Sequence, residues 1–584
     1  MNYKLKIDDN EQKGVFRTAF ERLMPFLAGE KKNLIIAFIA VLISSATTLY
    51  APILISDIID KYIQTSNLKG VLIFSAFLLL MYLLNLLSTY IQMTTMGEIG
   101  RRMLFNLRNA LFNKLQELPV AFFDQNKTGD LISRINNDTD KLNQFFSQAL
   151  MQFINNIMII IGAGIFLLVL NIRLGFSSLL PAIGVLIITQ ILSDWVRKTN
   201  LKSLQTLGAM SAEIQEGFNN FKVIVAFNRL DYFRNKFKQV NDDNYKASIS
   251  SGIASNIFLP IYTLAGNIAQ LIVLAFGIYL ITQGSLTVGL LVAFLLYVSN
   301  FYNPLRQMAS VWSSLQLALA GIDRISEILE LKSDMPLIVS EKIDGKSILE
   351  FRNVSFSYPQ GSEVLHNINF KLEKGKTYAI VGPTGGGKTT TASLMARLYD
   401  PTEGIVLLDG LDIRSYGASE RTQKIGFILQ EPFLFSGTIM DNIICGNEKY
   451  CKASKEQLVK TLKELKLFSL LDHFEKGIDT EISSNRDAMS LGQKQLIAFI
   501  RAVLRSPEIL ILDEATANVD TLTEQLLEEI LESLPKSTTK VIIAHRLNTI
   551  ENADQIFFVN AGDVTLAGSM KQAVDMLMHG KRES

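Results

Sequence analysis

Long stretches without any charged residue are the feature that most constrains what this chain can fold into. Four windows lack Asp, Glu, Lys and Arg altogether, and a fifth, 247–305, is long enough for two spans with a turn near residues 283–285. A membrane-spanning helix needs about 20 mostly apolar residues. Helices buried in a soluble protein normally keep a polar face, which these windows lack. The sequence therefore predicts six membrane spans, at about 33–55, 71–96, 142–172, 174–193, 250–281 and 286–305.

Composition agrees with this interpretation and excludes several classes of protein. Only 19% of the 584 residues are charged, against about 25% in a typical soluble domain. A net charge of +1 gives no basic field that would attract a nucleic acid. Two cysteines cannot form a disulfide framework, and four histidines are few for a metal site.

Basic residues in the connections predict how the chain is oriented. The connections after the second and fourth spans are long and rich in Lys and Arg, whereas the other three hold only Lys61, Lys69 and Arg173. Cytoplasmic loops carry such an excess of basic residues, so both long loops and both chain ends are predicted to be cytoplasmic. Helix-forming residues continue through these loops. We therefore expect helical hairpins that extend into the cytoplasm, with tips near 119–128 and 217–228.

A change of pattern near residue 347 marks a second domain. Residues 1–330 form the predicted transmembrane domain, and 331–346 form a linker. Short apolar runs, turns and helical segments then alternate over 347–584, which is typical of an α/β domain. The predicted fold is a multidomain membrane protein: an all-α domain of six spans with long cytoplasmic extensions, followed by an α/β P-loop NTPase domain.

The run GPTGGGKTT follows a predicted strand and fits the phosphate-binding pattern G-x-x-x-x-G-K-[ST]. Glycines let backbone N–H groups surround phosphate oxygens, and the next helix adds its positive N-terminal end. Lys388 is expected to bridge the β- and γ-phosphates of ATP, and the Thr389 hydroxyl to bind Mg²⁺. The candidate nucleotide-binding residues of this loop are Gly382, Thr384, Gly385, Gly386, Gly387, Lys388, Thr389 and Thr390.

Two carboxylates follow the apolar run 509–512. Asp513 stands at the end of this predicted strand, where an acidic residue can hold Mg²⁺. Glu514 comes next and is placed to polarise a water for in-line attack on the γ-phosphate. An Asp-Glu pair on a surface is usually only solvated charge. Here the apolar run before the pair predicts a buried strand, which favours a position of the pair at the edge of a sheet.

These motifs resemble those of the ATP-binding cassette (ABC) exporters, specifically half-transporters with six helices and one nucleotide-binding domain. The likeness covers nearly the whole chain. The segment SLGQ (490–493) is similar to the family's signature loop, and 122–138 and 213–227 are similar to its two intracellular loops. The resemblance implies that Gln430 senses Mg²⁺ and the attacking water, that Tyr358 stacks on adenine, and that His545 contacts the γ-phosphate. It implies nucleotide contacts for Ser490, Gly492, Gln493 and the D-loop residue Asp520.

The resemblance also implies a partner. In the family, two nucleotide-binding domains close head to tail over two ATP molecules, and the motion passes to the membrane helices. The signature here departs from the usual pattern, with Leu491 in place of glycine and Met489 in place of leucine. Lys388, Glu514 and His545 are nevertheless all present. An intact hydrolytic set with an altered signature favours the catalytically complete subunit of a heterodimer, and a homodimer remains an alternative.

The expected function is ATP-driven export of hydrophobic or amphipathic compounds across a bacterial inner membrane or plasma membrane. The uncharged spans support such a cargo, because a charged one normally requires charged partners within the membrane. A lipid flippase would use the same fold and remains an alternative. An ATP-gated regulator that does not pump is disfavoured, since gating alone does not require Glu514 and His545.

Overall fold

The computed structural model describes residues 3–5, 24–359, 361–451, 453–482, 489–513, 521–543, 553–568 and 570–579. The chain divides into two compact units. One comprises residues 6–116 and 128–330, and the other comprises residues 1–5, 117–127 and 331–584. We call them the membrane unit and the cassette unit.

Six helical segments in the membrane unit are long and apolar enough to cross a bilayer, which confirms the predicted number. They run over Met24–Ile63, Leu68–Glu117, Thr128–Leu170, Ile172–Asn219, Leu230–Thr282 and Val288–Glu330. Their elements are η1 (Ala28–Glu30), α2 (Lys31–Asp57), η2 (Ile58–Ile63), α3 (Leu68–Glu117), α5 (Thr128–Ser133), η3 (Arg134–Asp138), α6 (Thr139–Gln144), η4 (Phe145–Ala149), α7 (Leu150–Leu170), α8 (Ile172–Asn219), α9 (Phe221–Ala226), α10 (Leu230–Asn256), α11 (Phe258–Thr282) and α12 (Val288–Glu330).

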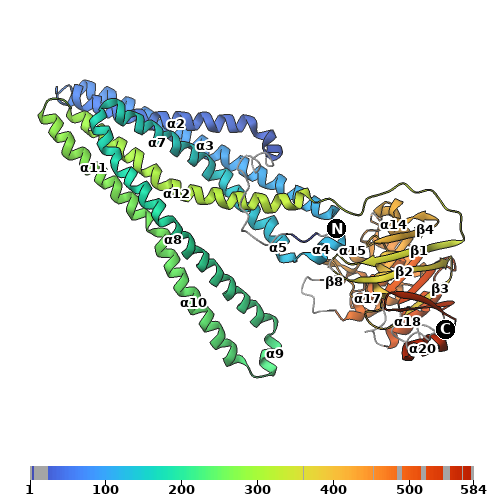
Figure 1. The fold of residues 1–584 in the computed structure, drawn as a ribbon. Coiled ribbons are helices and arrows are strands. Elements are labelled where there is room, and N and C mark those ends of the chain that lie inside the picture. Colours follow the sequence, from blue (N-terminus) through green and yellow to red (C-terminus); the bar gives the residue numbers. More distant parts are fainter. Residues whose placement is uncertain are drawn as a thin grey trace. The chain divides into compact units, whose positions relative to one another are not determined.

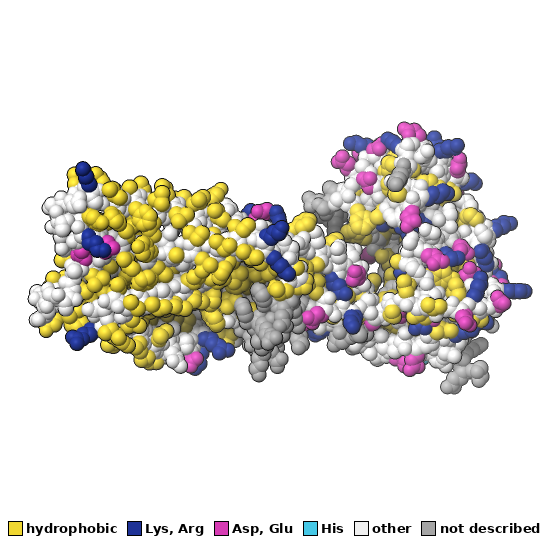
Figure 2. Space-filling view, turned by 90° about the horizontal axis from the view of Figure 1, so that it is seen from above, with side chains coloured by type: hydrophobic (Ala, Val, Ile, Leu, Met, Phe, Trp, Pro, Cys, Tyr) yellow, Lys and Arg dark blue, Asp and Glu magenta, His cyan; other side chains and the backbone are white. Residues whose placement is uncertain are grey.

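These helices are much longer than a bilayer requires. The 48 residues of α8 span about 70 Å at 1.5 Å per residue. Helices α8 and α10 run side by side, and α9 lies at the tip of this hairpin (Figure 1). On the face of the membrane unit that Figure 2 shows, hydrophobic side chains dominate and charges lie mostly near its ends. Such a surface fits contact with lipid or with another membrane chain rather than with water.

Local helix geometry differs from the sequence expectation in two places. The chain from Thr128 to Ala149 is not one regular α-helix, because the π-helical turns η3 and η4 interrupt it. The helical segment Leu230–Thr282 is likewise not continuous, because it breaks at Ile257, three residues before Pro260. Apolar periodicity predicts a helix but does not report a wider turn within it.

A cluster of charged side chains joins the third and sixth helical segments of the membrane unit. Arg134 is only 1% exposed, and its guanidinium donates to Asp130 at 2.9 Å and to Glu327 at 2.7 Å. Arg324 contacts Asp130 at 2.6 Å and Asp138 at 3.3 Å. The cluster therefore fixes η3 against the end of α12.

Replacing Arg134 with alanine is expected to destabilise the protein by about 3 kcal/mol, because Asp130 and Glu327 lose their ion pairs with the buried guanidinium, and only Asp130 keeps the neighbouring Arg324. The measurement is the temperature of irreversible aggregation in detergent, where the variant should fall by several degrees. Arg234→Ala removes an exposed arginine from α10 and is the control. Equal aggregation temperatures for the two variants would contradict a structural role for the cluster.

The cassette unit has two main sheets. Its strands are β1 (Ser347–Ser357), β2 (Glu363–Glu373), β3 (Thr377–Val381), β4 (Glu403–Leu408), β5 (Leu411–Asp412), β6 (Ile425–Ile428), β7 (Gly437–Thr438), β8 (Glu481–Ile482), β9 (Ile509–Asp513), β10 (Thr539–Ile543), β11 (Gln555–Asn560) and β12 (Asp563–Ala567). One sheet has the order β2-β1-β4-β5 and is antiparallel. The other has the order β12-β11-β3-β10-β9-β6 and is parallel except for β12.

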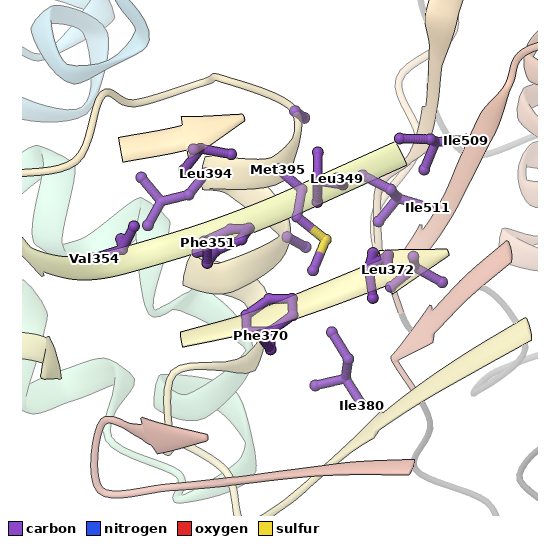
Figure 3. Close-up of a cluster of buried hydrophobic side chains, with 14 of the residues drawn as sticks. Leu349, Phe351, Val354, Phe370, Leu372, Ile380, Leu394, Met395, Ile509 and Ile511 are labelled. Atoms are coloured by element: carbon purple, nitrogen blue, oxygen red, sulfur yellow. The ribbon is translucent and has the colours of Figure 1, made fainter. Parts of the chain in front are cut away.

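Helices complete the cassette unit. They are α4 (Val120–Gln125), α13 (Lys388–Met395), η5 (Ile413–Ser415), α14 (Ala418–Lys424), α15 (Ile439–Ile444), α16 (Lys455–Glu464), η6 (Phe468–His473), η7 (Gly477–Asp479), α17 (Leu491–Val503), α18 (Thr521–Ser533) and α20 (Met570–His579). Side chains of both sheets meet on α13: Phe351 and Phe370 come from the antiparallel sheet, Ile380 and Ile511 from the parallel one, and Met395 from the helix (Figure 3). This core holds the loop before α13 against both sheets.

Candidate nucleotide-binding site

The candidate site lies where the parallel strands of the cassette end. β3 pairs in parallel with β10, β10 with β9, and β9 with β6. Their carboxyl ends therefore meet at one edge of the sheet, which is where open α/β sheets bind ligands. The phosphate loop follows β3, Asp513 ends β9, and Gln430 stands two residues after β6. Three separate motifs of the sequence thus meet at one edge.

Backbone geometry explains two of the loop's glycines. Gly387 has φ +110°, a conformation that disfavours any side chain. At Gly382, an added Cβ would lie 1.9 Å from the carbonyl oxygen of Val559 in β11. The loop is therefore held tightly against the neighbouring strand, and Thr384 and Gly385 at its crest stay exposed. The crest is the part free to meet a phosphate chain.

Lys388 begins α13 and turns back over its own loop. Its side chain is buried, and Nζ donates to the carbonyl oxygens of Gly382 and Pro383, both at 3.0 Å. The cation is thereby held inside the loop. This position agrees with the predicted role of Lys388 on the phosphates.

Thr389 and Asp513 meet across the sheet edge. The Thr389 hydroxyl donates to the Asp513 carboxylate at 3.4 Å, and Asp513 is buried at the end of β9. Among the described residues, no group of three or more His, Cys, Asp or Glu could hold a metal ion. Magnesium commonly uses one or two protein oxygens together with phosphates and water. The hydroxyl and carboxylate oxygens here are donors that such a site would use.

An aromatic group stands beside the loop. The ring of Tyr358 packs edge-on against Phe356 and Tyr399, with centroid distances of 4.9 and 5.4 Å. Its hydroxyl lies 3.1 Å from that of Thr390, a buried residue of α13. Tyr358 is thus anchored near the loop, which suits its predicted contact with adenine. The contact of Thr390 in this structure is with Tyr358.

The signature segment forms the start of α17. Ser490 is its N-cap: the Ser490 hydroxyl accepts from the Gln493 amide at 3.1 Å, and the Gln493 side chain accepts from the Ser490 amide at 3.0 Å. This is a capping box. The hydroxyl proton of Ser490 is not used by that bond and can still be donated to an anion. Gln493 also donates to the carbonyl of His473 at 3.4 Å, so its observed contacts are structural. Gly492 is buried in the first turn of the helix.

Three predicted residues, Glu514, Asp520 and His545, lie outside the described residues. The strands that precede Glu514 and His545 are described, and both β9 and β10 end at the edge that carries the phosphate loop. Gln430 is exposed at the same edge. These assignments stay predictions.

Sequence reasoning missed one contact that links the tip 119–128 to this site. Helix α4 lies in the cassette unit, where the Tyr399 hydroxyl donates to the carboxylate of Asp124. Burial, followed by this bond, raises the pKa of Tyr399 above its usual value, so Tyr399 remains a neutral donor at physiological pH. Because Tyr399 packs on Tyr358, α4 is connected to the nucleotide loop through two aromatic rings.

Two family models match this chain: the ABC transporter transmembrane region over residues 34–305, and the ABC transporter model over residues 365–517. The chain belongs to the ABC transporter family. The transmembrane region and the ATP-binding domain are fused in one chain, so it is a half-transporter. It binds ATP, and its ATPase activity is coupled to transport.

Relatives extend this finding along the chain. It is 33% identical over 580 residues to the "Uncharacterized ABC transporter ATP-binding protein YfiC" of Bacillus subtilis, covering 98% of this chain and 94% of that protein. It is 31% identical to the "Putative multidrug export ATP-binding/permease protein YgaD" of Bacillus subtilis, covering 95% and 97%. It is 31% identical to the "Fatty acid ABC transporter ATP-binding/permease protein" of Mycobacterium bovis, covering 85% and 78%.

A small polar cavity, which no motif predicted, lies between α11 and α12 of the membrane unit. Its volume is about 70 Å³, enough for two waters or a small polar group. Gln270 donates to Ser299 at 2.9 Å on its wall. Arg306, half-buried one residue beyond the predicted sixth span, also lines it. Arg306 has no ion-pair partner among the described residues.

Proposed function

We propose that this half-transporter exports amphipathic compounds from the cytoplasm and that the favoured cargo carries a negatively charged polar end. The observation that carries the proposal is the polar cavity between α11 and α12, which Arg306 lines from just beyond an uncharged predicted span. A half-buried arginine that borders a membrane span and faces a polar cavity is a candidate for binding an anionic group. Apolar surfaces on α8 and α11 suit the hydrophobic part of such a molecule, and one relative is named a fatty acid transporter, which supports the same class of cargo.

The test compares a fluorescent fatty acid that has a free carboxylate with its methyl ester, in proteoliposomes with ATP and Mg²⁺. The parent should transport the acid. Arg306→Gln should raise the KM for the acid about ten-fold, because a hydrogen bond to a charged group is lost, and should leave the ester unchanged. Arg173→Gln removes an exposed arginine elsewhere in the membrane unit and is the control. If the parent transports acid and ester equally well, or if Arg306→Gln behaves as Arg173→Gln, the proposal that the cargo carries a negatively charged end is wrong.

A lipid flippase is the second candidate. It is favoured by the apolar groove between α8 and α11, which is lined by Leu180, Pro181, Ile188, Leu264 and Ile268 and has a volume of about 720 Å³. That space suits acyl chains better than a compact drug. ATPase stimulation by anionic phospholipid but not by the fatty acid would favour a flippase.

The proposed machine is a dimer in which each ATP lies between the phosphate loop of one cassette and the signature segment of the other. Support comes from the two half-sites: a phosphate loop with an exposed crest, and a capped N-terminus of α17 with a spare hydroxyl proton at Ser490. Mg²⁺ would be held by Thr389 and Asp513 and would neutralise phosphate charge, with Gln430 at the same edge. Closure and release of the cassettes would move α4 and α9. The cavity between the helix bundles of the two chains would then open first inward and then outward.

The proposed partner is a second, different half-transporter. Leu491 is the first residue of α17, so a branched side chain stands at the helix start that would face the partner's ATP. A site with this side chain is expected to be weaker, while Lys388, Glu514 and His545 serve the stronger one. Size-exclusion chromatography and ATPase assays of the chain expressed alone test this; robust hydrolysis by a pure homodimer would remove the need for a partner.

The proposed location is a bacterial inner membrane or plasma membrane, with the cassette and both chain ends in the cytoplasm.

A further inference from the structure

A three-residue segment near the start of the chain, Tyr3–Leu5, is buried in the cassette unit. Tyr3 is 1% exposed and Leu5 is 4% exposed. The Tyr3 ring packs edge-on against Phe122 of α4 at 6.3 Å between centroids. Nothing in the sequence indicated this contact, because residues around Tyr3 are mostly polar. Burial of both side chains shows that the segment has a defined position.

Hydrogen bonds between the backbone of this segment and two side chains join it to the end of α4. The amide of Tyr3 donates to the side chain of Gln125 at 2.9 Å, and the amide of Leu5 donates to Asn126 at 3.0 Å. The Asn126 side chain in turn donates to the carbonyl of Tyr3 at 2.9 Å. The side chains of Gln125 and Asn126 therefore satisfy backbone groups of the segment, as the backbone of a neighbouring strand would in a sheet.

The Tyr3 side chain reaches a third part of the chain, the linker. Its hydroxyl donates to the Asp334 carboxylate at 2.5 Å and accepts from the Asp334 amide at 2.7 Å. Burial, together with the bond to Asp334, raises the pKa of Tyr3 above its usual value, so the hydroxyl keeps its proton at physiological pH. One side chain thus holds α4 and the linker together.

We infer that Tyr3–Leu5 is a clasp, a segment whose contacts fix α4 to the rest of the cassette unit. Because of these contacts, α4 moves together with the cassette. Helix α4 has only six residues, too few to be stable by itself, so its position depends on what holds it. Asp124 attaches it to Tyr399, and the clasp attaches Gln125 and Asn126 to the linker. Tyr3 is a positioning residue, and this role rests on the coupling function proposed for α4.

The decisive variant is Tyr3→Phe, which keeps the ring and removes the hydroxyl. In the full-length protein in lipid nanodiscs, hydrogen exchange at the α4 amides should become about ten-fold faster or more, because a bond to a charged group is lost. Asp334→Leu should act alike, and the double variant should be no worse than either single one. Asp334→Asn keeps a neutral acceptor and should lie between the parent and Tyr3→Phe. Lys332→Ala changes an exposed neighbour and is the control.

A second readout measures coupling itself. The number of ATP molecules hydrolysed per fluorescent fatty acid moved should rise about three-fold or more in Tyr3→Phe, with the Kd for ATP unchanged. Unchanged exchange at α4 in Tyr3→Phe would overturn the clasp, and faster exchange with unchanged ATP use would overturn its part in coupling. If the parent moves no fatty acid, the proposed cargo fails instead, and exchange still decides whether the clasp exists.

Discussion

Replacing Glu514 with glutamine is expected to stop ATP hydrolysis while ATP binding is retained. The amide has nearly the same size as the carboxylate, but it cannot accept a proton from the attacking water. Losing a positioned general base commonly lowers the rate by on the order of 10²-fold or more. Glu514 directly follows β9, whose last residue, Asp513, contacts Thr389 at the phosphate loop. The substitution therefore falls one residue after a strand whose end contacts the phosphate loop.

The measurement is steady-state ATPase activity alongside the Kd for ATP, in detergent and in proteoliposomes. Glu529→Gln makes the same chemical change at an exposed position on α18 and should hydrolyse ATP at the parental rate. The Glu514 variant should also accumulate a closed, ATP-loaded dimer. Hydrolysis at the parental rate by Glu514→Gln would show that another group is the base.

Lys388→Ala should instead weaken nucleotide binding itself, by about 10- to 100-fold in Kd. Charge-assisted bonds from the ammonium group to phosphate oxygens are lost, each worth roughly 1.5–3 kcal/mol. The same lysine bridges the carbonyls of Gly382 and Pro383 inside the loop. The loop therefore loses an internal support as well as a ligand contact.

Titration with a fluorescent ATP analogue measures this effect. Lys460→Ala, which removes an exposed lysine from α16, is the control and should bind the analogue as the parent does. The two main variants then separate binding from chemistry: Glu514→Gln keeps Kd and loses turnover, and Lys388→Ala loses both. A parental Kd in Lys388→Ala would contradict the assignment of this lysine to the phosphates.

Much of the fold and of the nucleotide loop could be predicted because the signals are local. Uncharged windows longer than a bilayer indicate spans wherever they occur, and G-x-x-x-x-G-K-[ST] after a strand indicates a phosphate loop. The order of strands in the parallel sheet is not a local signal, because β10 lies between β3 and β9 although it follows both in the sequence. It brings Asp513 to Thr389 across 124 positions of sequence. The motifs assigned both residues to Mg²⁺, but they did not show which strands bring the two side chains together.

Other features were hidden because their residues look ordinary in the sequence. Tyr399 resembled any aromatic after a helix, and only tertiary structure brings it to Asp124. Tyr3 stood in a polar beginning, and its partner Asp334 is 331 positions away. Arg306 follows an uncharged window by one residue, and the sequence does not show that it lines a cavity with α11. In each case the decisive contact depends on packing between distant segments, which no periodicity reports.

The central claim is that two cassettes enclose ATP and thereby change which side of the membrane the helices open to. Electron cryo-microscopy of Glu514→Gln, purified with any partner chain in lipid nanodiscs with ATP and Mg²⁺, tests it directly. The account predicts ATP on the loop of Lys388, with the signature segment of a second cassette against its γ-phosphate and the membrane helices opened away from the cassettes. ATP held by one cassette with no second cassette closed over it, or residues 33–305 outside the lipid, would contradict it.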